Sequence, residues 1–245
     1  MSTEEQKPER IAKRLARAGV CSRRDAERLI LEGRVKLNGE ILASPAQNVT
    51  EADQIEVDGN PVGAKEPTRL WRYHKPKGLV TTHRDEQGRQ TIFESLPEDM
   101  PRVISVGRLD LNSEGLILLT NNGALTRHLE LPATGWTRKY RVRAFGEMTD
   151  AKIARLRNGL TVDGVQYGSI LASVERETGD NVWIEMILTE GKNREIRRVL
   201  EFLGLTVNRL IRTSYGPFTL GNMDEGAVEE VSKKTIQETL GGKFL

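Results

Sequence analysis

The stretch Ser105-Val106-Gly107-Arg108-Leu109-Asp110, followed closely by Gly115-Leu116-Ile117-Leu118-Leu119-Thr120, decides how most of this chain folds. The apolar run is short, and the turn-forming pair Asn122-Gly123 follows it, so it predicts a buried strand. Asp110, with Arg108 beside it, then lies at the edge of that strand. Most loop aspartates cap a turn, but an acid at this place is also a candidate for chemistry, and both interpretations stay open at this point.

Length and composition point to a two-part chain without membrane attachment. A chain of 245 residues allows about two domains. The apolar runs are shorter than the ~18 residues of a membrane-spanning helix, and the N-terminus is polar, so we expect a soluble, cytoplasmic protein. The single Cys21 excludes an intramolecular disulfide, and three scattered histidines have no metal-ligand spacing. We therefore expect no metal site.

Charge is distributed unevenly, although the formal net charge is only +2. Residues 43–66 are mainly acidic, whereas residues 10–36 hold nine basic side chains against three acidic ones. A charge run is usually only a solvated surface. Here the basic residues lie opposite two apolar stripes, which favours a surface that binds phosphates. The basic residues are Arg10, Lys13, Arg14, Arg17, Arg23, Arg24, Arg28, Arg34 and Lys36.

Local signals in this basic region predict two helices and a hairpin. Apolar residues at helical spacing predict a helix over residues 10–18, which Gly19 ends in a left-handed conformation. Ser22 has the spacing of an N-cap for a second helix, and Gly33 is its stop signal. Asn38-Gly39 is the pair favoured in a type I′ turn, so a hairpin follows.

Three segments of this region resemble an S4 RNA-binding domain: Leu15-Ala16-Arg17-Ala18-Gly19, Ser22-Arg23-Arg24 and Gly33-Arg34-Val35-Lys36-Leu37-Asn38-Gly39. The resemblance implies a small α/β domain that docks on structured RNA, with the nine basic residues as its RNA contacts. We expect this domain to span residues 8–62, with a linker at 63–67 and a second domain at 68–245.

The second domain is predicted to be α+β. Its strands are too many for helical crossovers to separate, so the sheet should be largely antiparallel, with helices against it. A first strand begins near Trp71 and is interrupted by the turn Lys75-Pro76-Lys77-Gly78. Further strands are expected at 115–120, 138–144, 168–175, 182–189 and 207–213, and helices at 124–131, 149–157 and 193–203.

Two side chains of this domain are candidates for a site with Asp110. In the helix 193–203, Arg194 and Arg198 should point away from the core, whereas Arg197 lies at the boundary of the buried face. There it either reaches inward to pair with a carboxylate or extends along the surface to water. Tyr140 alternates with basic residues along its predicted strand. A lone tyrosine at such a position packs in the core more often than it takes part in catalysis.

Four motifs of the second domain together resemble the pseudouridine synthases, in particular those that act on ribosomal RNA and carry an N-terminal S4 domain. They are Lys75-Pro76-Lys77-Gly78, Gly107-Arg108-Leu109-Asp110, Arg138-Lys139-Tyr140 and Glu190-Gly191-Lys192-Asn193-Arg194-Glu195-Ile196-Arg197. Together with Arg209-Leu210-Ile211-Arg212 they are most similar to the subgroup that modifies large-subunit 23S rRNA.

The resemblance implies roles for five residues. Asp110 is the catalytic aspartate, which starts the isomerisation of uridine by attack or by proton abstraction at the sugar; the sequence does not choose between the two. Tyr140 packs on the flipped uracil near the proton lost from C5. Arg197 pairs with Asp110 and keeps it ionised. Leu210 lies under the base, and Arg108 fills the gap that the flipped nucleotide leaves.

Lys75, Lys77, Lys192 and Arg194 are the remaining expected contacts to the substrate RNA. The chemistry needs a carboxylate, a closed pocket and a held base, so we expect no metal, nucleotide or redox cofactor. The expected partner is ribosomal RNA, 23S by resemblance, or a pre-ribosomal particle, and the enzyme is expected to be a monomer.

Three alternative functions compete with this interpretation. The same chemistry on small-subunit 16S rRNA differs only through the subgroup motifs. A non-catalytic rRNA-binding assembly factor would keep the S4 domain but would not need Asp110, Tyr140 and Arg197 together. An aspartate-dependent hydrolase would need a second carboxylate or a metal cluster.

Overall fold

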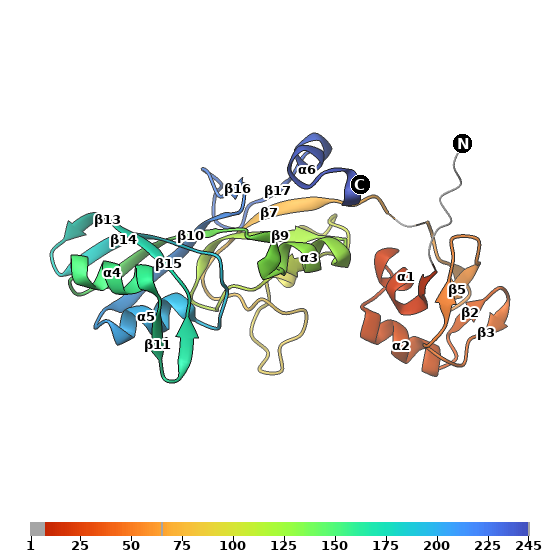
Figure 1. Ribbon diagram of the computed structural model, residues 1–245. Coiled ribbons are helices and arrows are strands. Elements are labelled where there is room, and N and C mark those ends of the chain that lie inside the picture. The colour runs from red at the N-terminus through yellow and green to blue at the C-terminus, as the bar shows by residue number, and fades with distance from the viewer. Residues whose placement is uncertain (1–7, 65, 245) are drawn as a thin grey trace.

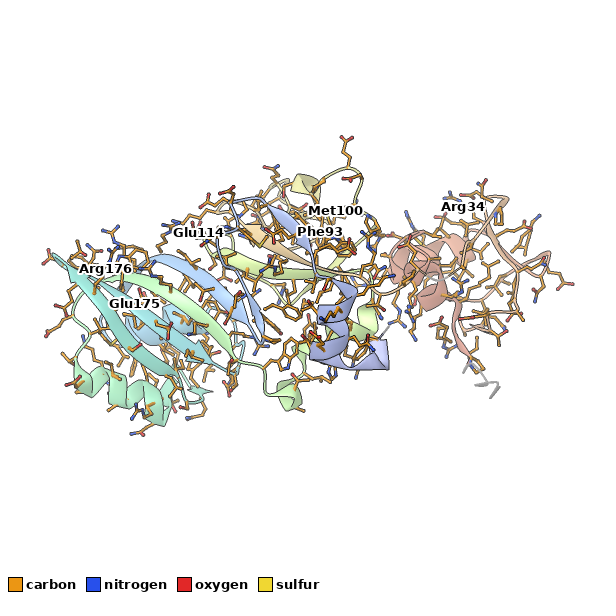
Figure 2. All side chains as sticks on the ribbon, turned by 90° about the horizontal axis from the view of Figure 1, so that it is seen from above. Arg34, Phe93, Met100, Glu114, Glu175 and Arg176 are labelled. Carbon is orange, nitrogen blue, oxygen red and sulfur yellow. The ribbon has the colours of Figure 1, made fainter. Side chains whose placement is uncertain are left out.

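The computed structural model describes residues 8–64 and 66–244 (Figure 1). A small N-terminal part with α1 and α2 lies at one end, and the remaining chain forms a larger part built on one long sheet. Figure 2 shows Glu114 between Arg34, which lies in the small part, and Arg176, which lies at the opposite end of the sheet. The fold is α+β, as predicted.

The N-terminal part has two helices, a two-stranded pair and a four-stranded sheet of order β3-β2-β5-β6. Its elements are β1 (Glu9–Arg10), α1 (Ile11–Arg17), α2 (Arg23–Leu31), β2 (Val35–Leu37), β3 (Glu40–Ile41), β4 (Asn48–Val49), β5 (Ile55–Val57) and β6 (Asn60–Pro61). Apolar side chains between residues 11 and 62 form a core of their own. The small part therefore has its own hydrophobic support.

The predicted local signals of this part are confirmed. The Ser22 hydroxyl accepts a hydrogen bond from the Asp25 backbone N–H at 3.0 Å and so caps α2. Gly19, just after α1, has a φ of +77°, the left-handed backbone conformation in which many α-helices end. Asn38 and Gly39 both have positive φ, 53° and 89°, which is the geometry of a type I′ turn between β2 and β3.

The larger part contains a nine-stranded sheet whose main order is β13-β14-β10-β15-β9-β7-β17, with β16 paired to β15 and β8 to β9. Every pairing is antiparallel except β9 with β15, so the predicted, largely antiparallel sheet is confirmed. The strands are β7 (Leu70–Lys75), β8 (Ile104–Val106), β9 (Glu114–Thr120), β10 (Arg138–Phe145), β13 (Leu171–Thr178), β14 (Asn181–Leu188), β15 (Thr206–Tyr215), β16 (Phe218–Thr219) and β17 (Val228–Glu230).

Helices cover this sheet and divide its core. The helices are α3 (Gly123–Glu130), α4 (Asp150–Asn158), α5 (Glu195–Phe202) and α6 (Lys233–Leu240), with 3-10 turns η1 (Phe93–Ser95), η2 (Pro132–Thr134) and η3 (Gly242–Phe244). One apolar cluster joins α4 and α5 to β10, β14 and β15. Another joins α3 and α6 to one face of β9, and residues between 79 and 109 cover the other face. A separate hairpin, β11 (Leu160–Val162) with β12 (Val165–Tyr167), packs into the first cluster.

The strand β9 is buried along its whole length, as predicted, and begins with a close approach to β15. Gly115 has a φ of +101°, and a Cβ there would overlap the backbone of Arg212. Only glycine fits this position, because any side chain would be both strained and blocked. Gly115 thus lets the loop that holds Asp110 run into the sheet directly beside β15.

One turn prediction is wrong. Asn122-Gly123 does not form a turn between strands; the Asn122 side chain caps α3 by accepting a hydrogen bond from the Ala124 N–H at 3.0 Å. Asparagine serves both purposes, so the pair alone did not distinguish them. The sequence interpretation also missed β8, β11, β12, β16, β17 and α6, most of which are too short to show periodicity.

Candidate active site

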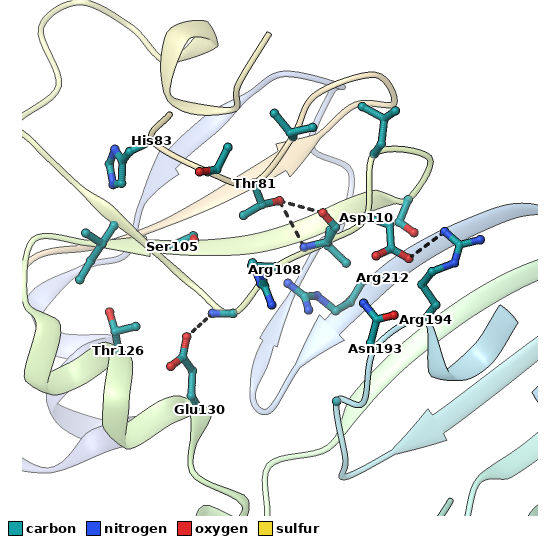
Figure 3. A pocket seen from close by; sticks show the side chains of 18 of the residues that line it. Thr81, His83, Ser105, Arg108, Asp110, Thr126, Glu130, Asn193, Arg194 and Arg212 are labelled. Carbon is teal, nitrogen blue, oxygen red and sulfur yellow. Dashed lines mark hydrogen bonds and ion pairs between the residues drawn. The ribbon is translucent and has the colours of Figure 1, made fainter. Parts of the chain in front are cut away.

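Asp110 lies in the loop between β8 and β9, and this loop lines a cleft of about 2080 Å³ (Figure 3). The other walls come from residues 80–89, from β10 and β15, and from residues 188–196. Ser22, Arg24 and Asp25 of the N-terminal part also line it. The cleft therefore brings segments that are far apart in the sequence to the loop that holds Asp110.

Hydrogen bonds from outside the loop hold it in place. Thr81 donates its hydroxyl to the Leu109 carbonyl at 2.8 Å and accepts from the Leu109 N–H at 3.3 Å. Glu130, on α3, accepts from the Gly107 N–H at 2.7 Å (Figure 3). Loop residues positioned by a rigid scaffold are typical of catalytic sites.

Lys75 anchors the loop through hydrogen bonds to backbone carbonyls, and its predicted role as a substrate contact is wrong. The side chain is fully buried and does not line the cleft. Its Nζ donates to the carbonyls of Pro76 at 3.0 Å, Asp110 at 3.1 Å and Ser113 at 2.8 Å, with a longer bond to Leu111. Burial lowers the pKa of Lys75 to about 8, against the opposing effect of Asp110 and Glu114.

Asp110 forms its ion pair with Arg194, at 3.7 Å, and 31% of its side chain remains exposed to the cleft. The sequence predicted that a helix begins at residue 193, but α5 begins at Glu195. Arg194 therefore lies just before the helix, with a left-handed φ of 51°. The helical-wheel argument, which turned Arg194 away from the core, does not apply to a residue with that backbone. The exposed carboxylate faces the cleft and can meet a substrate there.

The predicted pair between Arg197 and Asp110 is absent among the described ion pairs, so this prediction is wrong. Arg197 is half-buried, as its position on α5 indicated, and donates to the carbonyls of Asn112 at 3.0 Å and Val207 at 3.2 Å. Burial lowers its pKa, the charge of Arg194 lowers it further, and Asp110 opposes both. Arg197 thus ties α5 both to the segment after Asp110 and to the start of β15.

Tyr140 and Leu210 meet in the cleft from adjacent strands. Leu210 on β15 is paired with Val142 on β10, and Tyr140 is paired with Arg212 two residues further along. Both Tyr140 and Leu210 line the cleft with Asp110. The structure therefore brings together three of the predicted site residues on one surface.

Of the other predicted substrate contacts, Arg108 and Lys192 line the cleft and Lys77 does not. Arg108 is exposed and lines the cleft, as does Lys192, whose Nζ pairs with Glu190. Lys77 is half-exposed, lies 3.7 Å from the Glu114 carboxylate and is not part of the cleft wall.

Two buried cleft residues were missed by the sequence interpretation. Glu195 accepts a hydrogen bond from the Lys192 N–H at 2.9 Å, and burial raises its pKa. No capping-box signal marks it, because the residue three positions before it is Lys192 and the N-cap of α5 is Arg194. Arg212 is only 2% exposed, and no local signal marks a buried arginine in an apolar strand.

The nine basic residues of the N-terminal part do not form one free surface. Arg14 is buried and donates to the Gly63 carbonyl at 3.0 Å, so its predicted RNA contact is wrong. Arg17 is partly buried, and burial lowers its pKa. Four others are engaged within this part: Arg10 with the Ala46 carbonyl, Lys13 with Glu9, Arg28 with Asp25, and Arg34 with Asp58 and Glu32. Among the described residues, Arg23, Arg24 and Lys36 are exposed without an ion pair.

Over residues 8–64 and 66–244, no group of three His, Cys, Asp or Glu side chains is placed to hold a metal ion. In the same residues no helix is long and apolar enough to cross a membrane.

Comparison with known proteins agrees with this geometry. Residues 69–202 match the model of the RNA pseudouridylate synthase family, and residues 9–55 match the S4 domain. This chain belongs to the RNA pseudouridine synthase family. It is 49% identical over 230 residues to an RNA pseudouridine synthase of Rickettsia felis, covering 94% of this chain and 100% of the relative. It is 42% identical over 235 residues to the ribosomal large subunit pseudouridine synthase B of Pseudomonas aeruginosa, covering 93% and 61% of the two chains.

A solved structure shares the fold. A crystal structure of a pseudouridylate synthase matches with a TM-score of 0.65 and 24% identity, over 93% of this chain and 98% of that chain. The protein is therefore a pseudouridine synthase, an isomerase acting on RNA, with an S4 domain for RNA binding. The predicted enzyme class is confirmed, and the alternatives of an assembly factor without activity and of a hydrolase are wrong.

Proposed function

We propose that this pseudouridine synthase modifies one uridine of 23S rRNA. The observation that carries the proposal is the identity of about 40% with large-subunit enzymes over nearly the whole chain: 42% with the Pseudomonas aeruginosa protein and 39% with that of Yersinia pestis. The same chemistry on 16S rRNA is the other candidate, which the sequence separates from 23S only through the subgroup motifs.

Asp110 is the residue that starts the reaction. Its carboxylate is partly exposed in the cleft and forms an ion pair with Arg194 at 3.7 Å. The C1′–N1 bond of uridine breaks, the uracil turns, and a C1′–C5 bond forms. Asp110 either attacks the sugar or removes a proton from it, and both routes use the same position of the carboxylate.

Tyr140 and Leu210 hold the base during this rearrangement. They face the cleft from the neighbouring strands β10 and β15, so a planar base can lie between the tyrosine ring and the leucine side chain. Tyr140 is then close to the proton that leaves C5. Arg108, exposed at the cleft rim, takes the place of the flipped nucleotide in the RNA.

The chain divides into an RNA-docking domain at 8–62, a linker at 63–67 and a catalytic domain at 68–245. The separate core of the first part supports this division. Arg23, Arg24 and Lys36 are the side chains left to bind RNA phosphates through the S4 domain, and Arg24 lies at the cleft itself. Lys192 and Arg194 extend the positive surface on the far side of Asp110.

Pseudouridine mapping in total rRNA tests the proposal. Cells that lack this protein should lose one pseudouridine in 23S rRNA, and the wild-type gene should restore it, whereas Asp110→Asn should not. Asp163→Asn is the matched control, because Asp163 is exposed in a tight turn far from the cleft lining. Loss of a pseudouridine in 16S rRNA instead, or no loss in either rRNA, would refute the 23S target.

A further inference from the structure

Arg212 is a buried cation in the cleft wall with part of its hydrogen-bonding capacity unused. It lies on β15, is only 2% exposed, and lines the cleft together with Asp110. Its Nε donates to the Leu116 carbonyl at 2.7 Å, but its Nη2 is buried without a hydrogen-bond partner. A buried charged group without a full set of partners is costly and calls for an explanation.

The surroundings of Arg212 are positive. The guanidinium groups of Arg212 and Arg138 both stack on the ring of Tyr215, at 5.2 Å and 4.9 Å from its centre. Figure 3 shows the ends of Arg108 and Arg212 turned toward each other in front of the loop. Within the described residues none of these three arginines makes an ion pair, and the nearby Glu130 is bonded to the Gly107 N–H. The Glu195 carboxylate interacts with Arg138 from a distance but forms no ion pair with it among the described residues. Guanidinium groups gathered without a paired carboxylate favour the binding of an anion.

We propose that Arg212 binds a backbone phosphate of the RNA next to the target nucleotide, with Tyr215 as the platform that fixes its guanidinium. The proposal rests on the proposed function, which places the target uracil between Tyr140 and Leu210. Leu210 and Arg212 are two residues apart on one face of β15, about 6.8 Å along the strand. A base over Leu210 thus has its sugar-phosphate backbone within reach of Arg212.

Access to Nη2 depends on Arg108. Figure 3 shows the ends of the two side chains turned toward each other, and Nη2 of Arg212 is buried. When Arg108 enters the RNA stack it leaves this place, and a phosphate oxygen replaces it beside Nη2. The fork of Arg212 then makes a charge-assisted hydrogen bond that no lysine reproduces, because Nε must remain on the Leu116 carbonyl. Insertion of Arg108 and capture of the phosphate therefore occur together.

The test combines variants with RNA of altered charge. A short RNA contains the uridine that mapping identifies in whichever rRNA it lies, and single phosphates around it are replaced in turn by uncharged methylphosphonates. For the wild type, one position should lower kcat/KM about 10- to 100-fold, as expected for loss of one charge-assisted contact. Arg212→Gln should show a similar loss on unmodified RNA and no further loss at that one position. All other positions should affect both proteins equally.

Controls separate this role from a purely structural one. Arg157→Gln, an exposed arginine at the end of α4 outside the cleft, should behave as wild type at every phosphate. Arg212→Lys keeps the charge without the fork and should show an intermediate loss at the same position; it replaces the glutamine variant if that variant does not fold by circular dichroism.

If Arg212→Gln loses activity or stability but keeps the full methylphosphonate effect at every position, Arg212 only supports Tyr215 and the proposal is wrong. A target uridine in 16S rRNA would refute the proposed 23S function while leaving this test intact, so the two failures are distinguishable.

Discussion

Replacement of Lys75 by methionine should loosen the loop that carries Asp110 while leaving RNA binding intact. The variant removes three bonds of 2.8–3.1 Å from a buried ammonium to the carbonyls of Pro76, Asp110 and Ser113. Each buried carbonyl left without a donor costs about 1–3 kcal/mol. The Asp110 carbonyl keeps the Ser113 N–H as a donor at 3.0 Å, so this cost falls mainly on the Pro76 and Ser113 carbonyls. Methionine removes the cost of a buried charge, which offsets part of this loss, so we expect the free energy of unfolding to fall by about 2–4 kcal/mol.

The effect on turnover should be larger than the effect on folding. A displacement of a catalytic group by about 1 Å costs roughly 100-fold in rate, and Lys75 holds the backbone of Asp110 itself. Urea unfolding would measure the stability, and pseudouridine formation on rRNA from cells without the enzyme would measure turnover. Lys234→Met is the matched control, because its side chain is 85% exposed on α6. Near-wild-type turnover in folded Lys75→Met, or a fall in RNA affinity that accounts for the loss, would refute the anchoring role.

Four further outcomes are expected. Asp110→Asn should abolish pseudouridine formation with nearly unchanged RNA affinity in filter binding, and residual turnover above a few per cent would contradict a catalytic role. Arg194→Gln should lower turnover, because it removes the ion pair with Asp110 at 3.7 Å. Arg197→Gln should lower the urea midpoint of unfolding, because it removes the hydrogen bonds to the Asn112 and Val207 carbonyls. The reverse pattern would contradict the geometry. A fragment beginning near Pro67 should fold and keep activity at high RNA concentration, and the slope of log affinity on log salt should fall by only about 2–3, for the three free cations of the S4 domain; an unchanged slope would show that they touch no phosphate. Finally, Lys75 has a pKa near 10.5 in the unfolded chain and about 8 in the folded chain, so between these values the unfolded chain binds more protons. The difference in unfolding free energy between wild type and Lys75→Met should therefore rise with pH over this range. A difference that does not change with pH would contradict the lowered pKa.

The features that the sequence predicted well are those whose cause is local. The cap at Ser22 and the turn at Asn38-Gly39 depend on residues within four positions of each other, so their signals are complete in the sequence. The buried strand 115–120 follows from its own apolar run. The motif around Asp110 placed the candidate acid correctly in the cleft, because the loop and the strand that it enters are contiguous.

The features that failed depend on partners far along the chain. Lys75 finds the carbonyl of Asp110 35 positions away, and Arg197 finds that of Asn112 85 positions away. Neither acceptor has a signature, because every residue has a backbone carbonyl. Arg194 and Arg197 exchanged their predicted places for a different reason: one left-handed residue before α5 moved the start of the helix and with it the direction of Arg194.

The same difference between local signals and distant partners affects which residues we expect to bind RNA. The charge count placed the phosphate-binding surface on the nine basic residues of the N-terminal part, yet six of these are buried, partly buried or bonded to neighbouring groups of this part. Arg108, Arg138 and Arg212, which have no ion pair among the described residues, line the cleft, and Arg24 of the N-terminal part joins them there. An unpaired cation keeps its full attraction for phosphate, whereas a paired one must first give up its partner. We therefore expect the strongest RNA contacts beside Asp110, where the cost of flipping the nucleotide would have to be offset.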